Sequence, residues 1–123
     1  MEKPHKRLEA RKRSMELAMA AYRVTRNFPA EERYGLTAQM RGAAVSVPSN
    51  IAEGAARRTA PDFVNFLHTA RASLSELDTQ LELALAFRYV DAAAVEPVEE
   101  LMTTVDKTLA GLIKSLRART SSP

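Results

Sequence analysis

The sequence predicts an all-α fold, an antiparallel up-down four-helix bundle that assembles as a closed homo-oligomer. Four segments carry apolar residues at the three- and four-residue spacing of amphipathic helices. The connections between them are short, which makes neighbouring helices antiparallel. No segment alternates like a strand over a useful length. A chain of 123 residues is one domain, long enough for a core.

The first helix is predicted from Glu9 to Asn27, because a residue before proline, here Phe28, avoids the helical region. We expect a mobile basic extension at residues 1–8, the bundle at 9–116 and a disordered tail at 117–123. The first helix carries two apolar faces. One face holds Leu8, Met15, Met19 and Tyr22, and the other holds Leu17, Ala21, Val24 and Phe28.

The second helix is predicted from Leu36 to Glu53. Pro48 should kink this helix without ending it, because the apolar stripe continues in phase to Ile51. Gly54 is expected to end it as a C′ glycine. The core stripe comprises Leu36, Met40, Ala43, Val47 and Ile51, and the opposite side holds the small residues Ala38, Val45 and Ala52.

The third helix is predicted from about Ala60 to Arg88, with Thr59 as N-cap and Asp62 completing a capping box. A coiled-coil-like seam runs along it. A second apolar patch near its end points the opposite way and is too large to be scattered surface residues. The seam comprises Leu67, Ala70, Leu74, Leu77, Leu81 and Ala84, and the patch comprises Leu83, Phe87 and Val90.

The fourth helix is predicted to begin between Ala92 and Pro97, with Pro97 in its first turn. Gly111 costs roughly 1 kcal/mol inside a helix, so a neighbour is expected to approach it closely. Polar residues on the opposite side indicate burial of one face only. The buried stripe comprises Val98, Leu101, Val105, Leu109, Leu112 and Leu116.

The first three helices have apolar surface on more than one face, and four helices cannot cover all of it. We therefore expect other copies of the chain to cover the remainder. The predicted oligomer interface comprises Ala38, Val45, Ala52, Leu83 and Phe87.

The composition argues against several classes of site. There are no cysteines and two histidines, so neither thiolate nor histidine-rich metal sites are expected. No Glu-x-x-His motif and no nucleophile–base pair occurs, so we expect no cofactor, no metal and no enzymatic activity. No stretch approaches the ~20 apolar residues of a membrane span, and a cytoplasmic protein without a membrane partner is expected.

The net charge of +3 is unevenly placed, because residues 1–26 carry eight Lys and Arg against three acids. This asymmetry permits an anionic partner such as nucleic acid, and a solvated chain end explains it equally well. Few aromatic residues accompany the cations, so any binding should be directed at the backbone and sensitive to salt. The candidate phosphate contacts are Arg11, Lys12, Arg13, Arg41, Arg57 and Arg58.

Four polar residues border the stripe of the second helix: Gln39, Ser46, Asn50 and Glu53. With Glu76 and Gln80 of the third helix they are candidates to line a ligand site. The alternative is a hydrogen-bond network that fixes helix register. We favour the network, since none of these residues is a histidine or part of a serine–base pair.

The run from Gly35 to Gly54, GLTAQMRGAAVSVPSNIAEG, closely resembles the signature of the "four helix bundle protein" family. That family was first noticed as proteins encoded by intervening sequences within bacterial 23S rRNA genes. Its pattern is approximately G-L-[ST]-x-Q-[IM]-R-R-A-x-V-S-[IV]-[PA]-x-N-I-A-E-G. A second block is similar at Phe63, Phe66-Leu67, Ala70, Ser73-Leu74, Glu76-Leu77 and Gln80-Leu81.

The resemblance implies a ring of bundles, commonly a pentamer. A related protein, the accessory variability determinant of diversity-generating retroelements, forms such a barrel and works with a reverse transcriptase and RNA. Gly42 replaces the second arginine of the family pattern, which removes one candidate phosphate contact. Our leading hypothesis is a non-enzymatic adaptor that binds the backbone of RNA or DNA. The alternative is a scaffold that recruits a partner protein, such as a reverse transcriptase, through apolar outer patches.

Overall fold

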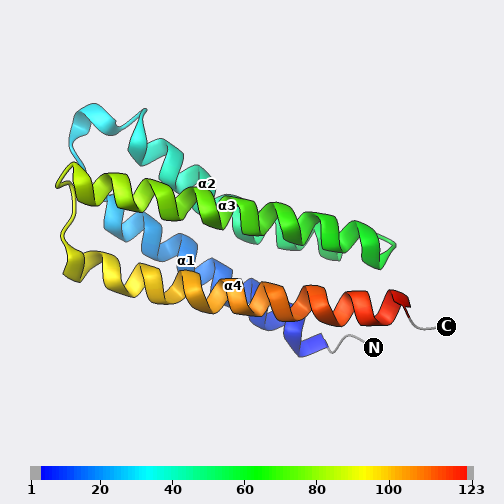
Figure 1. Ribbon diagram of the computed structural model, residues 1–123. Helices are drawn as coiled ribbons and strands as arrows, with labels where there is room; N and C mark the ends of the chain where they lie inside the picture. Colours follow the sequence, from blue (N-terminus) through cyan, green and yellow to red (C-terminus); the bar gives the residue numbers. More distant parts are fainter. Residues whose placement is uncertain (1–3, 122–123) are drawn as a thin grey trace.

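The computed structural model describes residues 4–121 and, within them, the side chains of residues 5–118. This part of the chain forms four α-helices and one short 3-10 helix, with no strand. Each α-helix packs against two others, α1 and α3 both against α2 and α4, so the four enclose one core (Figure 1). The elements are α1 (Pro4–Thr25), η1 (Ala30–Glu32), α2 (Leu36–Ala55), α3 (Ala60–Ala86) and α4 (Ala92–Ser121).

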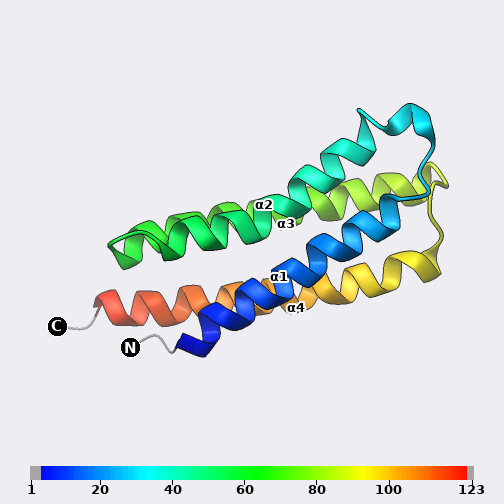
Figure 2. The ribbon, with the colours of Figure 1, turned by 180° about the vertical axis from the view of Figure 1, so that it is seen from behind.

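The path of the chain gives the bundle two different ends. Figures 1 and 2 show both termini and the α2–α3 turn at one end, and the α1–α2 and α3–α4 connections at the other. At the first end the guanidinium of Arg7 lies 4.7 Å from the ring centroid of Phe63. At the second end the hydroxyl of Tyr89 donates to Glu32 Oε2 over 2.8 Å.

Glu32 also closes the start of α2. Its Oε1 accepts a hydrogen bond from the backbone N–H of Leu36 over 3.0 Å. This bond, followed by the one from Tyr89, lowers the pKa of the Glu32 carboxyl. The same bond between the two side chains raises the pKa of the Tyr89 phenol. A single carboxylate therefore caps one helix and ties η1 to the α3–α4 connection.

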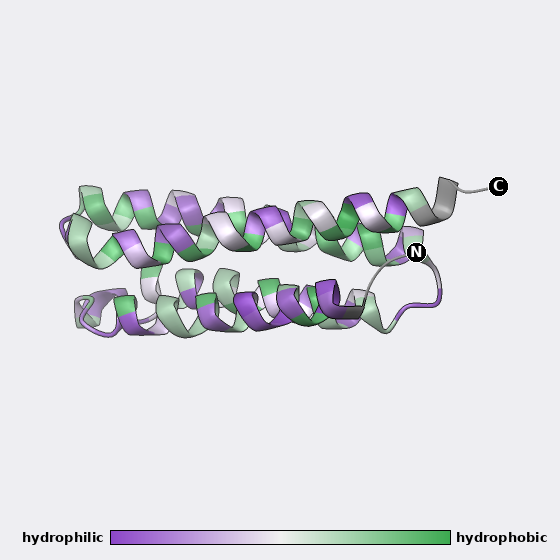
Figure 3. Ribbon diagram, turned by 90° about the horizontal axis from the view of Figure 1, so that it is seen from below, coloured by the Kyte–Doolittle hydropathy of each residue, from purple (hydrophilic) through white to green (hydrophobic). Residues whose placement is uncertain are grey.

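The core is made of the predicted stripes. The seam of α3 is buried throughout, and Leu36 of α2 and Leu101 of α4 are the only members of their stripes that are half-buried. In α1 the structure selects one of the two predicted faces, burying Leu17, Ala21 and Phe28. In Figure 3 hydrophobic and hydrophilic colours alternate along the helices, as expected for amphipathic helices around a core. The other face of α1 is exposed, at Leu8, Met15, Met19 and Tyr22.

Gly54 has a different role from the one predicted. Gly54 is buried and lies inside α2, which continues through Pro48 to Ala55. A β-carbon there would lie 2.7 Å from Phe63 Cδ1 and 2.8 Å from Phe66 Cβ. The absence of a side chain, and not a helix stop, is what this position requires, because α3 packs directly onto it.

The C-terminus of α3 is also earlier than predicted, at Ala86 and not Arg88. Tyr89 N–H bonds to Ala84 C=O and Arg88 N–H to Leu85 C=O, each over 3.0 Å, which is the Schellman pattern. Arg88 occupies the left-handed position with φ of 63°. Glycine is preferred there, because a β-carbon in this region costs roughly 1–2 kcal/mol.

α1 ends at Thr25, two residues before the predicted Asn27, and the start of α4 lies within the range predicted for it. α4 begins at Ala92 after Asp91, whose Oδ1 accepts from Ala94 N–H over 2.9 Å. Asp91 therefore acts as the cap, and Pro97 lies inside the helix and not in its first turn. Pro97 has no backbone N–H, so the carbonyl of Ala93, four residues earlier, receives no helical hydrogen bond from it. Ala93 is exposed, and water can reach this carbonyl.

Two segments expected outside the bundle are helical. Residues 4–8 belong to α1 and residues 117–121 to α4. The flanking residues 1–3 and 122–123 of the predicted extension and tail lie outside the described residues.

The close neighbour predicted at Gly111 is not found within the described residues, because a β-carbon built there meets no atom within 4 Å. Close packing within this chain therefore does not explain that glycine.

Gly54 and Gly111, both inside helices, provide a matched test of this packing. We expect Gly54→Ala to lower the free energy of unfolding by about 1–3 kcal/mol, because the new methyl group overpacks the Phe63 contact. Gly111→Ala should raise it by up to about 1 kcal/mol through helix propensity alone. Urea unfolding followed by circular dichroism measures both. Equal stability of the two variants would contradict the assigned role of Gly54.

Candidate nucleic-acid interface

The six predicted cations do not form one cluster. Arg11, Lys12 and Arg13 lie on α1, while Arg57 and Arg58 occupy the turn between α2 and α3. Arg41 lies near the start of α2, close to the other end of the bundle. The contacts of each cation show whether it remains available to bind a phosphate.

Arg41 is engaged with the end of α1. Its Nε donates to Thr25 Oγ1 over 2.9 Å, and its Nη2 donates to the carbonyl of Tyr22 over 3.4 Å. Its guanidinium also lies 4.5 Å from the centroid of the Tyr22 ring. A cation beside the last carbonyls of a helix is favourable with respect to the helix dipole. We therefore assign Arg41 to holding α1 against α2.

Arg13 is locally neutralised. Its Nε lies 2.7 Å from Glu9 Oε1 and its Nη1 lies 3.1 Å from Glu16 Oε1. The hydrogen bond with Glu9, followed by the attraction of both carboxylates, raises the pKa of its guanidinium. Arg11 and Lys12 are exposed, and no ion pair involves either of them within the described residues.

At the end with the termini, the predicted Arg57 and Arg58 are joined by Arg7 and Arg117, which the sequence did not single out. Arg57 lies 4.7 Å from the centroid of the Phe66 ring, and Arg58 beside it is exposed. Arg7 of α1 lies over Phe63, as described above. Arg117 of α4 lies 3.0 Å from His68 Nε2, with Arg117 as the donor because a guanidinium cannot accept.

Charge is therefore separated along the axis of the bundle. Dividing each helix at its midpoint gives residues 5–15, 46–73 and 106–118, which we call the positive half, and residues 16–45 and 74–105, the negative half. The positive half carries eleven Lys and Arg against four acids, a net charge of +7. The negative half carries five against ten, a net charge of −5.

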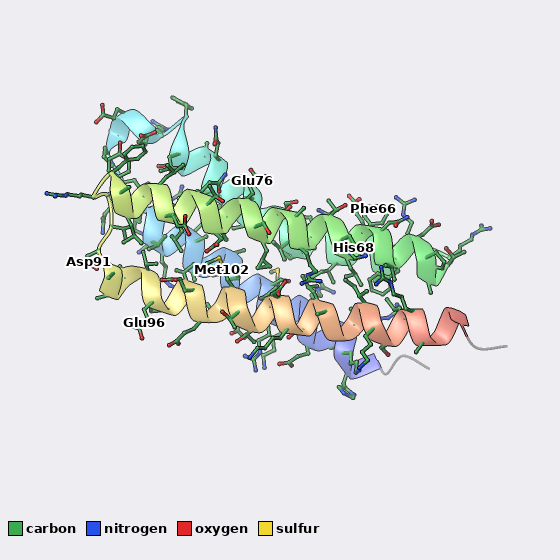
Figure 4. All side chains as sticks on the ribbon, in the orientation of Figure 1. Phe66, His68, Glu76, Asp91, Glu96 and Met102 are labelled. Carbon is green, nitrogen blue, oxygen red and sulfur yellow. The ribbon has the colours of Figure 1, made fainter. Side chains whose placement is uncertain are left out.

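Figure 4 labels residues from both halves of the bundle. Phe66 and His68 lie in the positive half, while Glu76, Asp91 and Glu96 lie in the negative half. A separation of this size along one axis produces a long-range field that favours anions at one end. Salt screens such a field over about 8 Å at physiological ionic strength.

The predicted polar residues of α2 divide into two groups. Ser46 Oγ lies 2.8 Å from Ser73 Oγ of α3, and Asn50 Nδ2 donates to Ser46 O over 2.8 Å and to its Oγ over 2.9 Å. Gln39 and Glu53 are exposed and take no part in these bonds. Ser46 and Asn50 thus link α2 to buried Ser73, a residue of the second family block that was not predicted to belong to this network.

Gln80, the other predicted neighbour, is buried and donates from Nε2 to Glu76 Oε1 over 3.2 Å. Its Oε1 has no hydrogen-bond partner among the described residues. The same part of the chain contains no group of three or more His, Asp or Glu placed to hold a metal ion. No helix of residues 4–121 has the length and apolar character needed to cross a membrane.

The comparisons with known proteins agree with this fold. A family model described as "23S rRNA-intervening sequence protein" matches residues 6–111. The chain belongs to the 23S rRNA-intervening sequence protein family. Among curated proteins, none matches the chain.

A solved structure shows the same fold. It is a protein of unknown function from the S23 ribosomal protein family of Bacteroides thetaiotaomicron, 24% identical to this chain. The match covers 89% of this chain and 98% of that one, with a TM-score of 0.81. The family resemblance carried by the Gly35–Gly54 motif is therefore confirmed, and the likeness to that structure concerns its fold.

The contacts of Arg41 predict a stability effect that an exposed arginine lacks. Arg41→Ala should lower the free energy of unfolding by about 1–2 kcal/mol, because it removes the bond to Thr25 and the contact with the Tyr22 ring. Arg58→Ala is the matched control and should change stability by less than about 0.5 kcal/mol. Thermal unfolding of both variants measures this difference, and an unchanged Arg41→Ala protein would show that Arg41 is not structural.

Proposed function

We propose that this protein is a non-enzymatic, self-associating helical bundle that binds the phosphate backbone of nucleic acid through its positive half. The observation that supports this best is the axial separation of charge, +7 against −5. The phosphate backbone dominates the affinity of most nucleic-acid-binding proteins, and an anion entering this field needs no sequence-specific contact.

The chemistry of the cations supports the same function. Most are arginines, whose planar guanidinium matches phosphate oxygens in a bidentate manner. Arg57 lies over the Phe66 ring, and a guanidinium stacked on a ring keeps its N–H groups directed outward at its edge. Such an arginine is partly ordered before it meets a phosphate, so less conformational entropy is lost on binding.

The family description adds an independent association. It names an intervening sequence of 23S rRNA, which connects members of the family with an RNA-coding locus. We take that association as support for nucleic acid over another polyanion.

Self-association is proposed from the outer faces of α1 and α2. Leu8 is 67% exposed, and Met15, Met19 and Tyr22 continue the same stripe along α1. On α2 and its C-cap Ala56, exposed small residues recur at steps of three and four, and a β-carbon at Gly42 would meet no atom within 4 Å. A second copy can approach such a surface closely, and the resemblance implies a closed ring of five. The small residues are Ala38, Gly42, Val45, Ser49, Ala52 and Ala56.

The exposed patch Leu83 and Phe87 lies on α3 and the turn after it, in the negative half. We propose that it takes part in the same assembly. A scaffold for a different protein is the alternative for this patch, and a nuclease-resistant protein partner lost on Phe87→Ala would favour it.

Binding to structured RNA should weaken steeply with salt. The expected slope of log K against log salt is about −0.9 for each phosphate neutralised on a duplex, so each contact costs about 3.5-fold in affinity between about 50 mM and 200 mM salt, and a loss of more than about tenfold is expected for several contacts. The double variant Arg11→Glu with Lys12→Glu should bind the RNA more weakly than the wild type at the same salt concentration. The matched control is Arg23→Glu with Arg26→Glu, from the negative half. Filter binding measures all three proteins, and affinity that does not change with salt would reject the proposal.

The assembly state is tested separately by sedimentation velocity at low micromolar concentration. We expect an oligomer, because a single chain leaves the α1 and α2 faces in water. Val45→Glu and Met19→Glu should yield folded monomers, since a charge enters the apolar contact, while Thr103→Glu on the exposed side of α4 should not. A folded wild-type monomer would refute self-association.

A further inference from the structure

We propose that the ligand of the positive half is a nucleic-acid duplex, held by its phosphate rows and not by its bases. The inference rests on the proposed function and specifies its substrate class. It follows from where the structure places aromatic rings, charge and grooves relative to one another.

Binding of single strands uses aromatic side chains on which successive bases stack. In this protein the exposed aromatics Tyr22, Tyr34 and Phe87 all lie in the negative half. Tyr22 is covered on one face by Arg41, and the guanidinium of Arg33 lies 5.5 Å from the Tyr34 ring centroid. The rings that bases can reach are therefore located where the net charge repels a nucleic acid.

The aromatic rings of the positive half are already occupied. Phe63 is 2% exposed and lies under Arg7, and half-buried Phe66 lies under Arg57, each at 4.7 Å from guanidinium carbon to ring centroid. His68 is exposed, but its Nε2 is bonded to Arg117. A single imidazole provides no platform for successive bases.

A single strand also needs an electropositive groove that follows its backbone. The groove between α3 and α4 has a volume of about 610 Å³ and reaches the positive half, but its lining is of mixed charge. Asp78, Glu99 and Asp106 line it beside Arg71 and Lys107, and Arg71 Nε is paired with Asp106 Oδ1 at 2.9 Å. This groove does not provide a continuous positive track.

Most of the cations of the positive half instead lie toward one end of the bundle. Apart from Arg71 and Lys107 of the groove, they come from the first half of α1, the α2–α3 turn and the last turns of α4, three segments that the chain path brings together (Figure 1). A surface of this kind fits an anion with high linear charge density and no need for base contacts. A duplex carries one charge per about 1.7 Å of its axis and presents its phosphates outward, while its bases remain stacked.

The experiment compares four fluorescent probes of equal length with the full-length protein at fixed salt: an RNA duplex, the corresponding DNA duplex, and an RNA and a DNA single strand without self-complementarity. Anisotropy should show at least about tenfold tighter binding of a duplex than of its single strand. Tight binding of both duplexes identifies phosphate rows as the shared chemistry, and preference for the RNA duplex adds a contact to the 2′-hydroxyl.

A charge variant locates the contact. Arg57→Ala with Arg58→Ala should weaken duplex binding and make the salt slope shallower by about 2. Arg23→Ala with Arg26→Ala removes the same charge from the negative half and should leave the duplex affinity and the salt slope unchanged. Single strands bound as tightly as duplexes would overturn this inference while leaving the proposed function in place. Failure of all four probes to bind would overturn both.

Discussion

The constraint on which the rest of the structure depends is the burial of one apolar stripe from each of four helices in a single core. Leu17, Met40, Leu77 and Leu109 are fully buried, one from each helix. Because one stripe of each helix faces this core and the connections are short, the residues that each helix exposes on its outer side are determined as well. The same packing brings both termini and the α2–α3 turn to one end, so charges from three distant segments become neighbours.

This gathering of charge acts against the stability of the fold that produces it. Like charges in the positive half repel one another, and pairs such as Arg13 with Glu9 and Glu16 relieve part of that repulsion. Some of the remaining cations lie over aromatic rings, which stabilises them without cancelling their charge. An anion that binds the folded state adds stability by mass action. If the proposed anion binds the positive half, it should therefore also raise the free energy of unfolding.

The parts of the fold that depend on local patterns could be predicted from the sequence. The start of α2 at Leu36, the Thr59 cap and the start of α3 follow from apolar spacing and capping chemistry. The start of α4 could not be decided, because Asp91 as a cap and Pro97 as a first-turn residue are both acceptable locally. Gly54 was misjudged because its requirement comes from Phe63, which lies on the next helix.

The candidate site was less predictable, for a related reason. Arg41 matches a phosphate contact in type and position, but its partners Thr25 and Tyr22 lie 16 and 19 residues earlier in the chain. Arg7 and Arg117 join the site only because the chain returns to the same end twice. The sequence does contain a signal for this, since consecutive helices with short connections imply where the termini lie. Adding the charges of the chain ends to those of the turn would have located the positive half.

The axial separation of charge also connects assembly with binding. If copies associate side by side through α1 and α2 in the same direction, their positive halves lie next to one another and repel. An anion shared between them would relieve that repulsion, so it would bind the assembly more tightly than the single chain. Linkage is reciprocal, and the same anion would stabilise the assembly by an equal free energy. Copies associating in opposite directions would place each positive half beside a negative one, leaving little net charge for a ligand. The orientation of the copies therefore decides between a surface that attracts nucleic acid and one that neutralises itself.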